Sequence, residues 1–146
     1  MHPAEQKVHD DVRDYGWHVI WVFNAEPEFA YTIGLHRTFG QPEVIVFGLP
    51  RKVAHSVLNA VAKEVRAGRT FASGSVSGEI LEGYEVAFRP VPLTAYEGHL
   101  GWGLWFYEGP TFPALQLVYP DRDGHFPWHP SVADTFRAEQ PVLADL

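Results

Sequence analysis

Two segments rich in β-branched and aromatic residues predict the centre of a β-sheet. Residues 29–36 read Phe-Ala-Tyr-Thr-Ile-Gly-Leu-His, and residues 44–49 are apolar almost throughout, which is typical of a strand covered on both faces. Residues 17–23 have the same strand chemistry, and a turn containing Pro27 separates them from 29–36. We therefore expect a hairpin followed by a central strand.

Helical periodicity marks two further segments. Apolar residues recur at helical spacing between residues 3 and 15, and again, more strongly, between residues 51 and 66. The second segment carries His55 and Asn59 four positions apart, together with basic residues outside its apolar stripe. We interpret that polar side as a solvated helix face.

The rest of the chain predicts shorter elements around the same sheet. Residues 67–78 are rich in Gly, Ser and Ala and indicate a flexible loop, whereas 81–91 and 114–119 read as strands. Residues 131–138 indicate a short helix, with Ser131 and Asp134 at capping-box spacing. The expected fold is α+β: a single domain over 1–146 with a mainly antiparallel sheet or partly open (split) β-barrel and two or three flanking helices.

The composition of the chain bears on which partners it can bind and on where in the cell it works. The 146 residues include no Cys, and the formal net charge is -7, with 11 Lys and Arg against 18 Asp and Glu. Basic residues are scattered along the sequence, so we expect no nucleic-acid partner. No apolar run is long enough to span a membrane, so we expect a cytoplasmic protein without a membrane partner.

Familiar catalytic motifs do not occur in the sequence. Phe106 stands where a dinucleotide fingerprint needs glycine, and Val76 stands where a hydrolase elbow needs its nucleophile. His125 and His129 are four apart, but the prolines around them argue against a helix that would present both to a metal. We predict no metal site and assign no catalytic residue; whether the chain is an enzyme stays open.

One strand face offers a candidate ligand surface. A two-residue period places Thr32, Gly34 and His36 together on a small, polar face of the strand 29–36. Such a face either lines a cavity or meets solvent or a tight packing bend. On a later strand, Gln116 lies on an otherwise apolar face and needs a hydrogen-bond partner, from a pocket or from a neighbouring loop.

Three motifs carry a resemblance to a known family. At residues 29–35, 42–50 and 112–121 the chain resembles a bacterial family named only as domain of unknown function 4262, and the similarity extends over the whole chain. The resemblance implies no activity. It indicates where a site would lie, in its motif residues Tyr31, Thr32, Gly34, Gln116, Asp121 and Trp128.

A second, topological likeness concerns the order of the elements. A terminal helix, a hairpin, a central strand, a helix and further strands follow one another as in flavin-reductase-like split barrels. That analogy implies FMN as a cofactor, with Arg37-Thr38 or Arg69-Thr70 as phosphate contacts, although the cofactor stays unknown on the sequence alone.

Two functional hypotheses from different classes follow. In the first, a small molecule or flat cofactor binds in an aromatic-lined pocket formed by Tyr31, Thr32, Gly34, His36, Gln116, Asp121 and Trp128. Aromatic loops at 102–107 and 126–128 would close that pocket, unless these aromatics simply fill the core. In the second, a non-catalytic protein-binding or immunity-type protein uses an acidic surface. A homodimer is compatible with either hypothesis.

Overall fold

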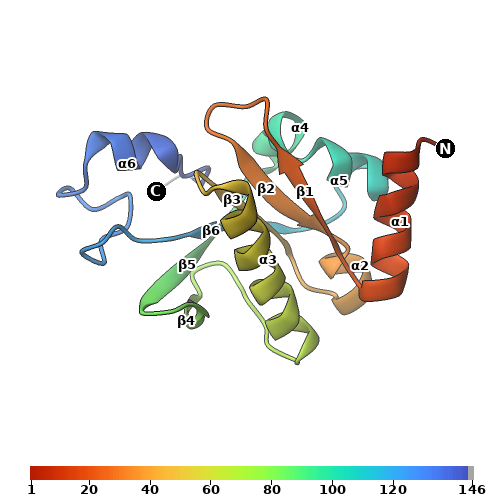
Figure 1. The fold of residues 1–146 in the computed structure, drawn as a ribbon, viewed down its shortest axis with the longest axis horizontal. Coiled ribbons are helices and arrows are strands. Elements are labelled where there is room, and N and C mark those ends of the chain that lie inside the picture. The colour runs from red at the N-terminus through yellow and green to blue at the C-terminus, as the bar shows by residue number, and fades with distance from the viewer. Residues whose placement is uncertain (145–146) are drawn as a thin grey trace.

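A mixed six-stranded sheet forms the centre of the computed structural model, which describes residues 1–144 (Figure 1). The strands follow the order β1-β2-β3-β6-β5-β4, so β1 and β4 are edges and the sheet is open. Neighbouring strands are antiparallel except β3 and β6, which run parallel. The strand bounds are β1 His18–Val22, β2 Phe29–Ile33, β3 Glu43–Phe47, β4 Val76–Leu81, β5 Tyr84–Pro90 and β6 Ala114–Val118. The predicted α+β class, antiparallel hairpin and central third strand are confirmed.

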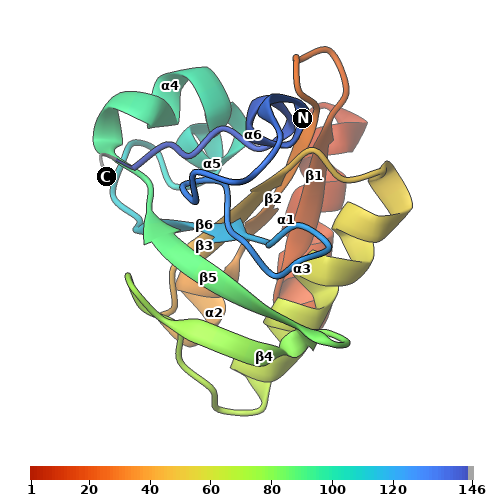
Figure 2. The same cartoon turned by 90° about the vertical axis from the view of Figure 1, so that its left-hand side faces the viewer.

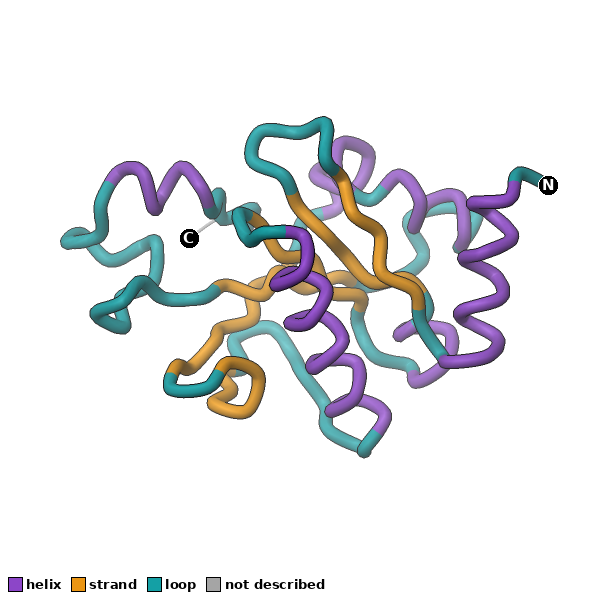
Figure 3. Tube along the Cα trace, in the orientation of Figure 1, coloured by secondary structure: helices purple, strands orange, loops and turns teal. Residues whose placement is uncertain are grey.

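Helices cover both faces of this sheet (Figures 2 and 3). They are α1 Pro3–Tyr15, α2 Leu35–Phe39, α3 Arg51–Arg66, α4 Tyr96–His99, α5 Gly101–Phe106 and α6 Asp134–Glu139, with a 3₁₀ turn at Leu93–Ala95. Helix α3 packs on one face, where Val44, Val46 and Phe88 share a core with its apolar stripe. Helices α1, α4 and α5 pack on the other face, against Tyr31 and Ile45. None of the helices in residues 1–144 is long and apolar enough to cross a bilayer.

The predicted strand 29–36 is shorter than expected. Strand β2 ends at Ile33 because Gly34 adopts φ +113°, and a Cβ at this position would lie 2.7 Å from the carbonyl oxygen of Gly16. The chain then turns into the short helix α2, which begins at Leu35 and contains His36. Thr32, Gly34 and His36 therefore do not share one strand face, and that part of the prediction is wrong.

The second half departs from the sequence-based expectation in three places. Strand β4 begins at Val76, inside the segment predicted as a flexible loop, and pairs with β5 around a turn at Gly83. The aromatic residues 102–107, expected to form a loop, lie almost entirely in helix α5, which follows α4. Helix α6 begins after Ala133 without a side-chain cap, so the expected capping role of Ser131 is wrong.

Candidate functional site

Three of the sequence-predicted site residues meet around one buried carboxylate. Oε1 of Glu43 accepts hydrogen bonds from Thr32 Oγ1 at 2.9 Å and from the Leu35 backbone N–H at 3.2 Å. Oε2 accepts from the backbone N–H groups of Gly34 at 2.9 Å and His36 at 3.2 Å, and from the Tyr107 hydroxyl. Glu43 thus joins β2, the start of α2 and the residue that follows α5.

This Glu43 cluster is closed to solvent. Thr32 is 0 % exposed and Glu43 is 1 % exposed. Burial raises the pKa of Glu43, while the donors from Tyr107, Thr32 and the α2 backbone act in the opposite direction. Burial and the nearby carboxylate raise the pKa of Tyr107. Because protein donors surround both carboxylate oxygens, the cluster leaves them no room to receive a ligand and serves to anchor α2.

Tyr31 and Gln116 are also hydrogen-bonded within the core. The Tyr31 hydroxyl accepts from the Trp102 backbone N–H at 2.9 Å, which connects β2 to α5. The Gln116 amide donates to the Pro141 carbonyl at 2.7 Å and accepts from the Leu143 N–H at 2.9 Å. Gln116 therefore has the neighbouring-segment partners that the sequence analysis gave as one alternative, and it holds the C-terminal segment against β6.

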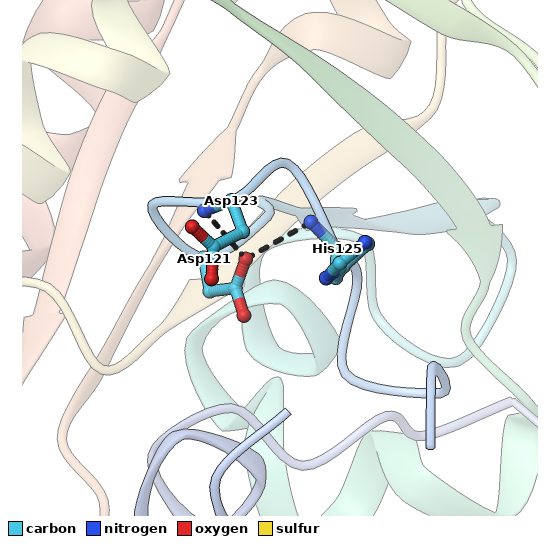
Figure 4. A group of neighbouring side chains, drawn as sticks. All are labelled: Asp121, Asp123 and His125. Atoms are coloured by element: carbon cyan, nitrogen blue, oxygen red, sulfur yellow. Dashed lines mark hydrogen bonds between the residues drawn. The ribbon is translucent and has the colours of Figure 1, made fainter. Parts of the chain in front are cut away.

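Asp121 and Trp128 lie in the loop after β6, apart from the Glu43 cluster. Asp121 Oδ1 accepts from the backbone N–H groups of Asp123 and His125, each at 2.9 Å (Figure 4). The ligand atoms of these three side chains lie within 4.8 Å of one another, which is a donor set that a divalent cation could bind. The Trp128 ring stands 4.3 Å from the guanidinium carbon of Arg89.

A different region has an open cavity lined by polar and charged groups. Between α1, β1 and α3 lies a hollow of about 530 Å³, here called the α3 cleft. Figure 1 shows β1 between the two helices. The cleft is lined by Lys7, Asp11 and Tyr15 of α1, Trp17, His18 and Val19 at the start of β1, and His55, Asn59, Lys63 and Arg66 of α3. It exists because β1 is an edge strand, so no further strand fills this space.

Two hydrogen bonds fix the groups at the floor of the α3 cleft. Asp11 Oδ2 lies 2.7 Å from His18 Nδ1 and joins α1 to β1. Trp17 Nε1 donates to Asn59 Oδ1 at 2.9 Å and joins the start of β1 to α3. The amide nitrogen of Asn59 and Nε2 of His18 have no hydrogen-bond partner in residues 1–144. Both remain available to a molecule in the cleft.

Positive charge gathers at this cleft although the chain is acidic. An adjoining hollow shares His55, Asn59 and Lys63 and adds Arg51 and Lys52. Together the two hollows are lined by five of the 11 Lys and Arg residues but by one acidic residue, Asp11. The basic residues are scattered in sequence yet grouped in space, which corrects the premise used against a nucleic-acid partner; the absence of such a partner stays a prediction.

Ion pairing divides the basic residues of the described chain into two groups, and Arg37, Arg51, Lys52, Arg89 and Arg122 are unpaired like Lys63 and Arg66. Asp and Glu side chains pair with Arg13, Arg69 and Arg137. By contrast, Lys63 and Arg66 form no ion pair with any residue from 1 to 144, and the Arg66 guanidinium lies 5.4 Å from the Trp17 ring centroid. Unpaired cations over an aromatic floor are suited to an anion.

The pKa values of Asp11 and His55, two titratable residues of the α3 cleft, are shifted for different physical reasons. Burial opposes ionisation of Asp11, but hydrogen bonds from Lys7 and His18 outweigh it and lower the pKa of Asp11. Burial, followed by the charges of Arg51 and His18, lowers the pKa of His55. The cleft therefore contains an ionised Asp11 that orients His18, and a His55 that favours its neutral form.

Sequence reasoning missed both Glu43 and the α3 cleft. Glu43 opens an apolar strand, a position where a carboxylate needs partners, and this was the available signal. On α3, the helical spacing of His55, Asn59, Lys63 and Arg66 was visible. Their meeting with Asp11 and His18 depends on how α1 and β1 pack, which a single sequence does not state.

Comparison with known proteins places the chain in a family. The family model described as domain of unknown function (DUF4262) matches residues 11–133. Comparison with curated proteins and with solved structures gives no match. The family match includes β1 to β6, the Glu43 cluster and the lining residues of the α3 cleft except Lys7. The chain belongs to the family of domain of unknown function 4262.

Proposed function

We propose that this protein binds a small anionic molecule in the α3 cleft. The observation that carries the proposal is the pair of unpaired cations, Lys63 and Arg66, in a cavity of about 530 Å³ on a chain with net charge -7. An anion at this position would gain charge-assisted hydrogen bonds that no protein carboxylate supplies.

The cleft also supplies groups that would orient such a ligand. Asn59 is held by Trp17, so its amide nitrogen has a fixed direction. His18 is held by Asp11, which fixes the ring; because Nδ1 donates to the carboxylate, Nε2 can donate to an anion only when the ring is protonated. Tyr15, 66 % exposed, and Trp17 provide apolar surface for the rest of the molecule.

Isothermal titration calorimetry with a panel of small anions tests this proposal. Acetate, succinate, sulfate, inorganic phosphate and phenyl phosphate span one and two charges, with planar and tetrahedral groups. For whichever anion of the panel binds, we expect Lys63→Gln and Arg66→Gln each to lower the affinity about tenfold, which is roughly 1.4 kcal/mol of binding free energy. Arg122→Gln is the matched control, since Arg122 is exposed in the loop after β6. Absence of binding by the whole panel, or equal affinities in all variants, would contradict the proposal.

A groove elsewhere on the molecule is a second candidate ligand site, and it is lined by aromatic residues as the sequence analysis expected. A groove of about 330 Å³ between the β1–β2 hairpin and α4 and α5 is lined by aromatics that include Trp21, Phe29, Tyr31 and Trp102. Phe23 also lines it and is 71 % exposed, which favours a flat ligand or a protein partner. If FMN binds in this groove, titration with FMN should quench the fluorescence, and Phe23→Ala should weaken the quenching. Unchanged fluorescence would exclude FMN as the ligand. A pull-down that compares wild type with Phe23→Ala would then test the protein-partner alternative.

A further inference from the structure

We infer that the anion bound in the α3 cleft also carries a hydroxyl group, which donates its proton in a hydrogen bond to Nε2 of His18. The inference rests on the proposed function and specifies the class of ligand, a small organic anion with a hydroxyl group. It follows from two hydrogen bonds that fix one acceptor and one donor at the floor of the cleft.

The first hydrogen bond determines which ring nitrogen of His18 carries the proton. Asp11 Oδ2 lies 2.7 Å from His18 Nδ1. Burial opposes ionisation of Asp11, but hydrogen bonds from Lys7 and His18 outweigh it and lower the pKa, so the carboxylate is ionised and can only accept. The proton between the two side chains therefore belongs to Nδ1, and in the neutral ring Nε2 keeps its lone pair.

The lone pair of His18 Nε2 is accessible from the cleft. His18 lines the cleft, its side chain is 19 % exposed, and Nε2 has no hydrogen bond within residues 1–144. In the same residues, the one buried side-chain nitrogen or oxygen without a hydrogen-bond partner is Nδ1 of His36. Nε2 of His18 is therefore in contact with solvent, and it is an acceptor that a donor on a ligand can reach.

The second hydrogen bond fixes the side-chain amide of Asn59. The indole N–H of Trp17 can only donate, and it donates to Asn59 Oδ1 at 2.9 Å. The NH₂ group of Asn59 is thus the free end of the amide, without a partner in residues 1–144. Asn59 lines the cleft from α3 and His18 lines it from β1. The floor therefore offers a donor and an acceptor, and a hydroxyl group can serve both because it donates and accepts.

The charges of the cleft favour a hydroxyl over an ammonium group as the donor to His18. Lys7, Lys63 and Arg66 line the cleft, and its one acidic lining residue, Asp11, already pairs with Lys7 Nζ at 2.9 Å. An ammonium group would find repulsion and no free carboxylate, whereas a hydroxyl donates without a charge. An anion that lacks a donor would leave the lone pair of Nε2 without a partner.

Calorimetry with matched pairs of anions tests the inference. The pairs are acetate and glycolate, succinate and malate, and ethyl phosphate and 2-hydroxyethyl phosphate, in which the second member adds one hydroxyl group. At about pH 8, where an ordinary imidazole is neutral, the hydroxylated member of at least one pair should bind about threefold to tenfold more tightly. The pair with the tighter binding distinguishes a hydroxy acid from a hydroxylated phosphate ester.

Variants assign the hydroxyl preference to one histidine. His18→Phe removes the acceptor and should bring the affinity ratio of the pair close to one. His55→Asn removes the other imidazole of the cleft and should keep the ratio, as should His125→Asn outside the cleft. Each ratio compares two ligands on the same variant, so a general loss of anion affinity cancels. A preference that persists in His18→Phe, or that is lost in His55→Asn, overturns the inference.

Nitrogen-15 NMR of the histidine rings tests the role of Asp11 as a positioning residue. In wild type, the His18 spectrum should show a proton on Nδ1 and none on Nε2, and the opposite tautomer overturns the inference without any variant having to fold. In Asp11→Asn the new amide can donate to Nδ1, which moves the ring proton to Nε2. The hydroxyl preference should be lost with that move, and a preference that remains with the proton on Nε2 also overturns the inference.

The outcomes separate this inference from the proposed function. Equal affinities for the two members of every pair overturn the inference and leave an anion site in place. No binding by any of the six anions, or by the panel of simple anions, overturns both.

Discussion

The Glu43 cluster and the α3 cleft both bring charged groups together, but the charge of Glu43 is fully hydrogen-bonded whereas cations of the cleft are open to solvent. In the Glu43 cluster, five protein donors point at one carboxylate that is 1 % exposed. In the α3 cleft, Lys63 and Arg66 have no carboxylate partner in residues 1–144, and His18 Nε2 has no hydrogen bond there. A gathering of polar residues therefore indicates a ligand site only where the protein has not already satisfied them.

Position in the sheet explains this difference. Glu43 begins β3, an interior strand, and α2 and Tyr107 close over it. The cleft lies along β1, an edge strand flanked by α1 and α3 with nothing beyond it in the described chain. An interior carboxylate such as Glu43 needs several donors, because an unsatisfied buried charge is costly, although the buried Nδ1 of His36 beside it has no hydrogen-bond partner in residues 1–144; edge positions leave free donors in contact with water.

The largest expected effect is loss of stability on changing the closed cluster. Glu43→Gln places an NH₂ group against the α2 backbone N–H groups, so at least one buried donor loses its acceptor. We expect a loss of about 2–4 kcal/mol in the free energy of unfolding, measured by urea denaturation. Glu85→Gln, on the exposed part of β5, is the matched control and should change stability by less than about 0.5 kcal/mol. Equal stabilities for Glu43→Gln and wild type would mean that the cluster does not anchor α2.

A smaller effect is expected at the tyrosine of the same cluster. Tyr107→Phe removes the hydroxyl that donates to Glu43 and accepts from the Arg37 N–H. The ring and its packing against Phe112 stay, so only the polar contribution is lost. We expect about 1–2 kcal/mol less stability by the same denaturation assay. A loss as large as that of Glu43→Gln would show that the other four donors to the carboxylate depend on this hydroxyl.

The fold was largely predictable because its periodicities are strong. The stripe of α3 and the apolar run of β3 each permit one interpretation, and both elements form as expected. The end of β2 was not predictable from alternation, because Leu35 continues the apolar pattern into α2 while Gly34 turns the backbone. A two-residue period describes a strand only as long as the backbone stays extended.

The candidate site was less predictable than the fold. Thr32, Gly34 and His36 do meet, but around Glu43, since the contact arises from the turn into α2 and not from a shared strand face. The polar side of α3 was interpreted as solvated because helical spacing alone cannot show that α1 and β1 stand opposite it. The tertiary packing at the edge strand supplies that information.

A pH-dependent prediction concerns the pair that joins α1 to β1. The pKa of Asp11 is lower in the folded chain than the ordinary value near about 3.9, so its ionised form stabilises the fold above that pH. The contribution is lost as the pH falls through the folded-state pKa. We expect Asp11→Asn to be about 0.5–1 kcal/mol less stable than wild type at neutral pH, and this difference should disappear as the pH falls below the folded-state pKa of Asp11. A difference that persists unchanged at low pH would assign the effect to packing and not to charge.

Substitutions of Lys63 and Arg66, which we expect to lower anion affinity the most, should change the stability of the fold the least. Lys63 and Arg66 make no ion pair within residues 1–144, and both lie in the last turn of α3, where a positive charge is attracted to the helix C-terminus and repelled by the neighbouring cation. Because these two effects oppose each other, Lys63→Gln should change the free energy of unfolding by no more than about 0.5 kcal/mol in either direction. Urea denaturation at low and high salt measures the change, and added salt should shrink it because salt screens both effects. A clear loss of stability in Lys63→Gln would mean that Lys63 has a structural role, and the contrast between a closed cluster and an open cleft would then fail at its central residue.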